Sequence, residues 1–171
     1  AVILATGARG QMLDVPGERE FEMKGLCYSA MTYAPLMVDK RVIVIGERMM
    51  AVRAVAELSR IATQVTLIAE SAGDLDTPPA RAVLNAENVG VCRPARVLEV
   101  LGDEYARAVV VEVSDHRDEI EADAIFVEKA LIPNLAAGMT GGELSHQETK
   151  DMAPLGGQRL AAILERMFAD G

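Results

Sequence analysis

Residues 41–51 read Arg41-Val-Ile-Val-Ile-Gly46-Glu-Arg-Met-Met-Ala51, an apolar strand that runs through a single glycine into a helix. In a working G-x-G-x-x-G/A turn, the first glycine makes the tight bend and the second lets the backbone approach a pyrophosphate. The third position packs the helix against the strand. Gly46 and Ala51 fill the first and third positions, but Arg48 stands at the second. The stretch therefore predicts a nucleotide-binding α/β fold whose phosphate turn lacks one glycine.

The composition limits the classes of function that are open to the chain. Its 171 residues are 50% hydrophobic and carry a formal net charge of −9, from 17 Lys and Arg against 26 Asp and Glu. This balance supplies no clustered positive field for nucleic acid or for an anionic membrane surface. The longest apolar candidate, residues 30–38, is too short to span a bilayer and is interrupted by Thr32 and Pro35. We expect one main core, no nucleic-acid partner and no membrane insertion.

The cysteines and histidines give no metal or disulfide pattern. Cys27 and Cys92 lie far apart, and His116 and His146 stand in polar segments without a cysteine or carboxylate at ligand spacing. We therefore expect no bound metal ion. No signal-peptide pattern is visible, and we expect a cytoplasmic protein. The chain opens at Ala1 directly on an apolar run, which indicates that it was cut from a larger protein.

The hydrophobic pattern predicts a mixed α/β architecture. Strands are expected at residues 1–5, 41–45, 64–68, 95–100, 105–113 and 119–127, and helices at about 48–61, 77–88 and 157–168. The continuously apolar runs 1–4, 42–45, 65–68 and 125–127 predict one mainly parallel sheet with helices on its faces. The other β-rich runs predict an antiparallel meander.

Short segments then follow one another in a specific order. They are Ala-Thr-Gly-Ala at 5–8, Val-Pro-Gly-Glu at 15–18, Gly25-Leu-Cys-Tyr-Ser29, the Gly46 turn, Val65-Thr-Leu-Ile68 and Ile132-Pro-Asn134. Over about residues 1–134, this order and spacing resemble the pyridine-nucleotide domain of the thioredoxin reductase family of FAD/pyridine-nucleotide disulfide oxidoreductases. The resemblance implies a Rossmann-like domain with a parallel sheet and a β-meander, flanked by parts of an FAD-type domain. It also implies electron transfer from NAD(P)H through FAD to a Cys-x-x-Cys pair.

The resemblance also implies a division of the chain. Residues 1–20 are expected to be the end of an FAD-type domain and a hinge, 21–130 the NAD(P)-binding-like domain, and 131–171 a hinge and the closing helix of the FAD-type domain. FAD then requires residues outside this chain, because its own glycine turn belongs upstream and residues 145–152 lack the expected Gly-Asp motif. We expect the missing FAD-domain half or a partner subunit as partner, in a homo- or hetero-oligomer.

The sequence departs from the family pattern at the thiol centre and at the nucleotide turn. Ser29 and Thr32 stand where the cysteine pair is expected, so a disulfide relay cannot run there and no catalytic residue is assigned. The neighbouring Cys27 is interpreted as a small buried side chain. Arg48 either blocks a pyrophosphate or swings outward and pairs with it.

The residues after the strand at 64–68 bear on the choice of nucleotide. Ala69-Glu70-Ser71 replaces the basic residues of NADPH-using relatives, and a carboxylate there repels a 2′-phosphate but accepts hydrogen bonds from a ribose diol. We therefore assign Gly46, Arg48, Met49, Ala51 and Glu70 as cofactor-binding residues, with NADH favoured over NADPH and bound weakly.

Two functions from different classes remain open. The first is the nicotinamide-nucleotide-binding portion of a thioredoxin-reductase-like flavoprotein oxidoreductase without disulfide reductase activity. The second is a redox-inert structural or regulatory subunit that uses a degenerate active site and the same fold to bind partner proteins. An absorption spectrum of the full-length protein discriminates between them, because a bound flavin is coloured.

Overall fold

The computed structural model describes residues 7–134, which fall into two units. One unit is Gly10–Ala130. The described residues of the other are 7–9 and 131–134. β1 (Ala8–Gly10) pairs with β10 (Leu131–Pro133) in a two-stranded sheet. The strand expected at residues 1–5 and the helix expected at 157–168 lie outside the described residues.

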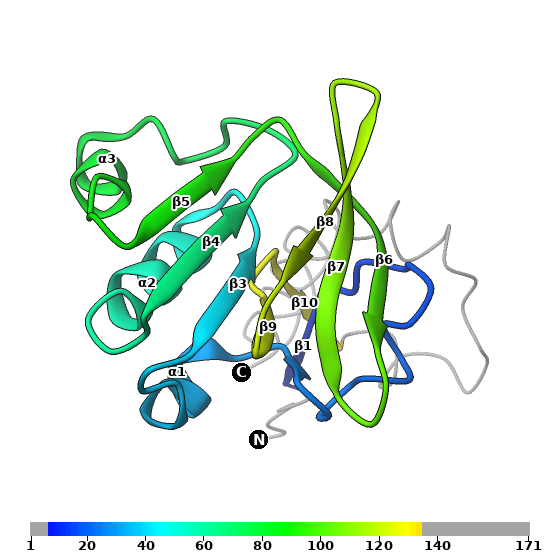
Figure 1. The fold of residues 1–171 in the computed structure, drawn as a ribbon. Helices are drawn as coiled ribbons and strands as arrows, with labels where there is room; N and C mark the ends of the chain where they lie inside the picture. Colours follow the sequence, from blue (N-terminus) through cyan, green and yellow to red (C-terminus); the bar gives the residue numbers. More distant parts are fainter. Residues whose placement is uncertain (1–6, 135–171) are drawn as a thin grey trace, which may run out of the picture. The chain divides into compact units, whose positions relative to one another are not determined.

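A five-stranded parallel sheet forms the centre of the larger unit (Figure 1). Its order is β2 (Leu26–Cys27), β9 (Ala124–Val127), β3 (Arg41–Ile45), β4 (Gln64–Ile68) and β5 (Val89–Cys92). All four residues of β9 and four of the five in β3 are buried, as the continuous apolar runs predicted for a sheet covered on both sides. The α/β fold class and the strands expected at 41–45 and 64–68 are confirmed.

One face of this sheet is covered by helices. These are α1 (Ala30–Tyr33), the 3₁₀-helix η1 (Ala34–Leu36), α2 (Met49–Leu58) and α3 (Pro78–Leu84). In α2, Ala51, Val55 and Leu58 are fully buried against the sheet, while Arg53 is exposed. This amphipathic spacing made α2 readable from the sequence. The helix expected over 77–88 is shorter than predicted, because α3 already ends at Leu84.

The opposite face of the sheet is covered by strands, so the prediction of helices on both faces was wrong. Alternate side chains of each strand point to opposite sides. Val44 packs with the helices, whereas Ile43 and Ile45 pack with a three-stranded antiparallel sheet. That sheet comprises β6 (Arg96–Gly102), β7 (Ala106–Val113) and β8 (His116–Glu121). The predicted meander therefore forms a layer of the core.

The strand predicted over 119–127 is in fact two strands in different sheets. Its first part belongs to β8, which pairs with β7, and its second part is β9, which pairs with β2 and β3. The chain changes sheet at Ala122 and Asp123. There the Asp123 N–H donates to the Arg41 carbonyl at 2.8 Å, and the Arg41 N–H donates to Asp123 Oδ2 at 2.8 Å. These two bonds attach the incoming β9 to the start of β3.

Within 7–134, no helix has the length and apolar character needed to cross a membrane. In that stretch, too, no three His, Cys, Asp or Glu side chains gather closely enough to hold a metal ion.

Candidate functional site

The turn between β3 and α2 lies at the carboxyl end of the central strand. Gly46 has φ +155°, its N–H donates to the Ile68 carbonyl at 3.0 Å, and an added Cβ would overlap the Glu128 carbonyl oxygen. The same Cβ would lie 3.1 Å from the Ala51 Cβ. Gly46 and Ala51 therefore meet the steric demands of the first and third positions of a dinucleotide turn.

Three loops meet at this carboxyl edge. Ile45 pairs with Val127 on one side and with Ile68 on the other, so β9 and β4 end level with β3. The chain reaches these two neighbours of β3 through different connections, α2 on one side and the meander on the other. Ligands of open α/β sheets bind at such a switch point, outside the carboxyl ends of the strands.

The start of α2 already holds a carboxylate. Asp74 Oδ2 accepts a hydrogen bond from the Met49 N–H at 3.0 Å, and the Asp74 N–H donates to the Glu47 carbonyl at 2.8 Å. Gly73, at φ +46°, leaves no room for a Cβ against the Glu47 carbonyl. The β4–α3 loop is thus closely packed on the turn, with Asp74 at the positive end of the helix where a phosphate would bind.

Arg48 stands at the N-cap position of α2 in an extended conformation, with φ −106° and ψ 172°. Its side chain is exposed and makes no hydrogen bond or ion pair to the described part of the chain. Its backbone carbonyl accepts the first helical bond, from the Val52 N–H at 3.2 Å. Both outcomes foreseen for Arg48, obstruction and outward pairing with a phosphate, stay predictions.

Glu70 lies beside the turn and is joined to a residue that the sequence did not suggest. Its Oε1 accepts a hydrogen bond from Lys129 Nζ at 3.1 Å, and the exposed fractions of the two side chains are 51% and 17%. Glu70 follows β4 and Lys129 follows β9, and these two strands flank β3. The ion pair therefore links the two sides of the Gly46 turn.

Ser29 and Thr32 come together at the start of α1. Their side-chain oxygens are 2.8 Å apart, so two hydroxyls share a hydrogen bond where the family resemblance places two thiols. The preceding Tyr28 is fixed by a hydrogen bond from its hydroxyl to Glu18 Oε1 at 2.8 Å. Glu18 is buried and also accepts the Leu13 and Asp14 N–H groups, which explains the glutamate at the end of the Val-Pro-Gly-Glu segment.

Glu128 connects this hydroxyl pair with the nucleotide turn. Its backbone carbonyl abuts Gly46, and its Oε1 accepts the Ala30 N–H at 2.6 Å. Only 5% of Glu128 is exposed. Burial raises the pKa of the Glu128 carboxyl above its ordinary value, and the hydrogen bond from Ala30 acts in the opposite direction. The carboxyl therefore holds its proton to a higher pH than an exposed glutamate.

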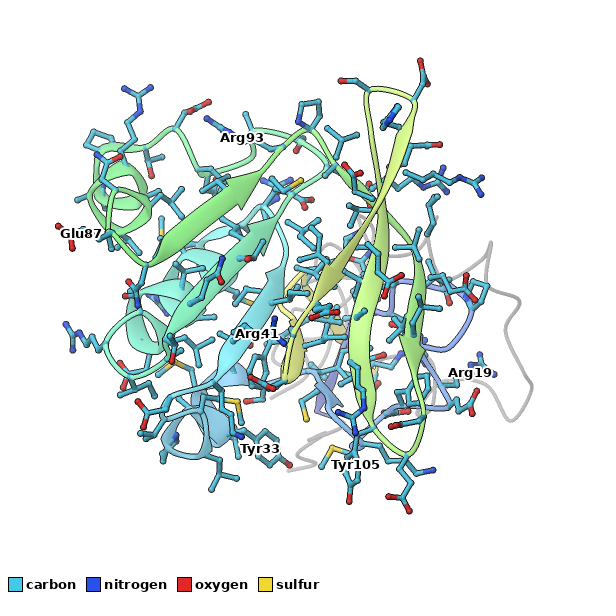
Figure 2. The ribbon with its side chains drawn as sticks, viewed as in Figure 1. Arg19, Tyr33, Arg41, Glu87, Arg93 and Tyr105 are labelled. Atoms are coloured by element: carbon cyan, nitrogen blue, oxygen red, sulfur yellow. The ribbon has the colours of Figure 1, made fainter. Side chains whose placement is uncertain are left out.

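Replacing this buried carboxyl with an amide should stabilise the protein at high pH. Since the folded-state pKa is raised, ionised Glu128 lowers stability above that pKa, and the effect disappears as the pH falls below the unfolded-state value. Glu128→Gln keeps an acceptor for Ala30, so we expect Tm to rise by about 2 °C or more at pH 8 and to match the wild type near pH 4. Glu87→Gln, at an exposed position in Figure 2, is the matched control. An equal gain at both pH values would contradict the explanation.

The two cysteines lie on opposite edges and opposite faces of the sheet. Cys27, in edge strand β2, packs with the helices, and Cys92, in edge strand β5, packs with the meander. Four strand spacings separate them by about 19 Å, far beyond the ~7 Å limit between disulfide-bonded Cα atoms. Burial raises the pKa of both thiols, and Asp118 adds to the rise at Cys92. Cys27 therefore has no resolving partner in Cys92.

The structure thus gathers the predicted residues into two neighbouring groups. Gly46, Arg48, Met49, Ala51 and Glu70 surround the turn, and Ser29 and Thr32 lie at the start of α1, joined to the turn through Glu128. Sequence reasoning missed Asp74, Glu128 and Lys129. Each of these acts on a partner distant in the sequence, and no local spacing marks such a pairing.

Comparisons with known proteins agree with this geometry. Residues 1–147 match the family described as pyridine nucleotide-disulphide oxidoreductase. The chain is 38% identical over 137 residues to an alkyl hydroperoxide reductase subunit of Pseudomonas putida and 34% identical over 137 residues to an NADH dehydrogenase of Bacillus subtilis. Each match covers 78% of this chain but only 26% and 27% of the respective relative.

Solved structures with the same fold include thioredoxin reductases. The enzyme of T. acidophilum superposes with a TM-score of 0.72 at 25% identity, over 82% of this chain and 47% of that one. The enzyme of Lactococcus lactis gives a TM-score of 0.69 at 22% identity, over 79% of this chain and 47% of that one. This chain therefore spans about a quarter of its sequence relatives and about half of these structures.

Proposed function

The chain belongs to the pyridine nucleotide-disulphide oxidoreductase family, and from that premise we propose that it is the nicotinamide-nucleotide-binding portion of a flavoprotein oxidoreductase without disulfide reductase activity. The observation that carries the proposal is the turn at Gly46, at the carboxyl end of the central strand. Gly46 and Ala51 meet the steric demands of a dinucleotide turn there, and Glu70 lies beside it. In this proposal, FAD binds only with the help of residues outside this chain, either in the missing half of the FAD-type domain or on a partner subunit.

The residues around the turn fit the adenosine half of a dinucleotide. The Glu70 carboxylate is half exposed and can accept hydrogen bonds from both hydroxyls of a ribose, whereas a 2′-phosphate would meet a like charge. A bound nicotinamide would supply a hydride. The role of this chain is to bind and orient the nucleotide. Ser29 and Thr32 offer no thiolate that could carry electrons onward to a disulfide.

The second candidate function is the redox-inert structural or regulatory subunit. One observation favours it. The Asp74 carboxylate accepts the hydrogen bond of the first N–H group of α2, which a pyrophosphate would otherwise accept. A fold retained for binding a partner protein tolerates such an occupant.

Saturation-transfer NMR of the intact protein with NADH and with NADPH tests the proposal. We expect a signal from the adenosine protons of NADH that exceeds that of NADPH at equal concentration, because Glu70 repels the 2′-phosphate. Glu70→Gln should narrow the difference, and Glu87→Gln should leave it unchanged. Equal or stronger NADPH signals in the wild type would refute the role of Glu70. Absence of signal from either nucleotide, together with an absorption spectrum without flavin, would support the inert subunit.

A further inference from the structure

Lys129 and Glu70 hold equivalent places on the two sides of the nucleotide turn. Val127, Ile45 and Ile68 form one row across the ends of β9, β3 and β4. Lys129 and Glu70 each follow two residues after their member of this row. Strands that flank a common neighbour are about 10 Å apart, so two long side chains must lean toward each other to close the 3.1 Å ion pair. The ammonium of Lys129 is thereby held near the Gly46 turn.

The turn is poor in groups that attract a phosphate. It lacks the second glycine, its first helical N–H is bonded to Asp74, and Glu47 and Glu70 add negative charge beside it. A dinucleotide brings two further negative charges in its pyrophosphate. Arg48 brings one cation to the turn, but its side chain is exposed and no bond to the described part of the chain holds it toward this group. A cation that is held in place is therefore needed to offset the repulsion.

Lys129 has the properties that this position requires. Its side chain is only 17% exposed, so much of its conformational freedom is already lost in the folded protein. An ammonium donates charge-assisted hydrogen bonds to carboxylates and phosphates alike, so the N–H group that Glu70 now accepts can be turned to a phosphate oxygen. The carboxylate of the pair is half exposed, and such a pair is easily exchanged.

We propose that Lys129 is the pyrophosphate-binding residue of this site, exchanging Glu70 for a phosphate oxygen when the dinucleotide binds. Glu70, released from the ammonium, then accepts hydrogen bonds from the adenosine ribose. The lysine supplies a positive charge that is already held beside the turn, which the exposed side chain of Arg48 does not, and the ion pair keeps both side chains in place before the ligand arrives. This inference rests on the proposed nucleotide-binding function.

The test uses the intact protein and two ligands that separate the anion from the ribose. Inorganic pyrophosphate, followed by ³¹P NMR, reports on the anion position alone, and ADP-ribose, followed by calorimetry, reports on both groups. Lys129→Met keeps the apolar stem and removes the charge. We expect this variant to bind both ligands with about tenfold lower affinity, which corresponds to the loss of one charge-assisted hydrogen bond. Lys129→Arg should restore most of the binding.

Glu70→Gln adds a readout that a merely structural role would not move. It frees Lys129, so pyrophosphate should bind about threefold or more tighter, while ADP-ribose should gain less or lose affinity because an amide oxygen is a weaker acceptor for the diol. The matched control is the ion pair between Arg41 Nη1 and Glu121 Oε2, which is 3.2 Å long. Arg41, labelled in Figure 2, is the first residue of β3 and so lies at the other end of this strand from the turn. Arg41→Met and Glu121→Gln change the same charges there and should leave both ligands unaffected.

The outcomes separate this inference from the function on which it rests. If ADP-ribose binds equally well to the wild type and to folded Lys129→Met, the role of Lys129 is refuted and the function survives. If pyrophosphate binds in a Lys129-dependent way but ADP-ribose and NADH do not, the anion site stands and the nucleotide function is refuted. If the wild type binds none of these ligands, both are overturned.

Discussion

Replacing Ser29 and Thr32 together with cysteine should give this chain an internal disulfide that its natural sequence cannot form. The two hydroxyl oxygens are 2.8 Å apart across the first turn of α1, and a disulfide requires about 2.0 Å between sulfur atoms with Cβ atoms roughly 4 Å apart. The two side chains thus already point toward each other. After mild oxidation, we expect mass spectrometry of the double variant to show the loss of two hydrogens, and we expect none in the wild type.

Two controls decide whether the geometry is responsible. Ser29→Cys alone should remain a free thiol, and the double variant in a Cys27→Ser background should still close its disulfide.

The unmodified protein should reduce neither thioredoxin nor a small aromatic disulfide with NADH or NADPH, because a hydroxyl forms no mixed disulfide. Catalytic turnover that is abolished by Cys27→Ser would contradict this prediction and identify Cys27 as the active cysteine.

Gly46→Ala should be among the most destabilising single changes in the chain. A Cβ at this position overlaps the Glu128 carbonyl oxygen, and φ +155° is a backbone conformation that other residues rarely adopt. Strain of this kind costs about 1–3 kcal/mol, and the displacement of β9 from β3 adds to it, so we expect a loss of roughly 3 kcal/mol or more. Against a total stability of about 5–15 kcal/mol, the urea midpoint should fall clearly.

Gly90→Ala is the matched control for this prediction. Gly90 lies in β5, has no positive φ, and a Cβ added there meets nothing within 4 Å. The change should alter the free energy of unfolding by no more than about 1 kcal/mol, and it can even stabilise by restricting the unfolded chain. Equal losses in the two variants would mean that the steric requirement at Gly46 has been overestimated.

The elements that the sequence predicted best are those whose signal is local. β3 and β4 are short apolar runs with clear ends, and α2 shows Ala51, Val55 and Leu58 at helical spacing. The turn residue Gly46 was readable for the same reason. Because only a glycine fits there, one residue type at one spacing sufficed to place the candidate site.

The features that escaped prediction depend on distant partners. β2 is two residues long and has no periodicity of its own; it is a strand because Leu26 and Cys27 pair with Ile125 and Phe126. The break between β8 and β9 is set by the hydrogen bonds of Asp123 to Arg41. Asp74, Glu128 and Lys129 likewise gain their importance only once the loops at the carboxyl edge have come together.

The place of β9 also determines how this sheet can assemble in time. β9 is the last strand of the Gly10–Ala130 unit to be synthesised, yet it lies between β2 and β3. Until it arrives, the edge of β3 that faces it carries unpaired backbone groups on a strongly apolar strand, a surface that invites pairing with other chains. Pairing Ile43 with Ile125 closes a long loop, which makes this step slow. Insertion of one late strand between two earlier ones is therefore the event that commits the nascent chain to its fold.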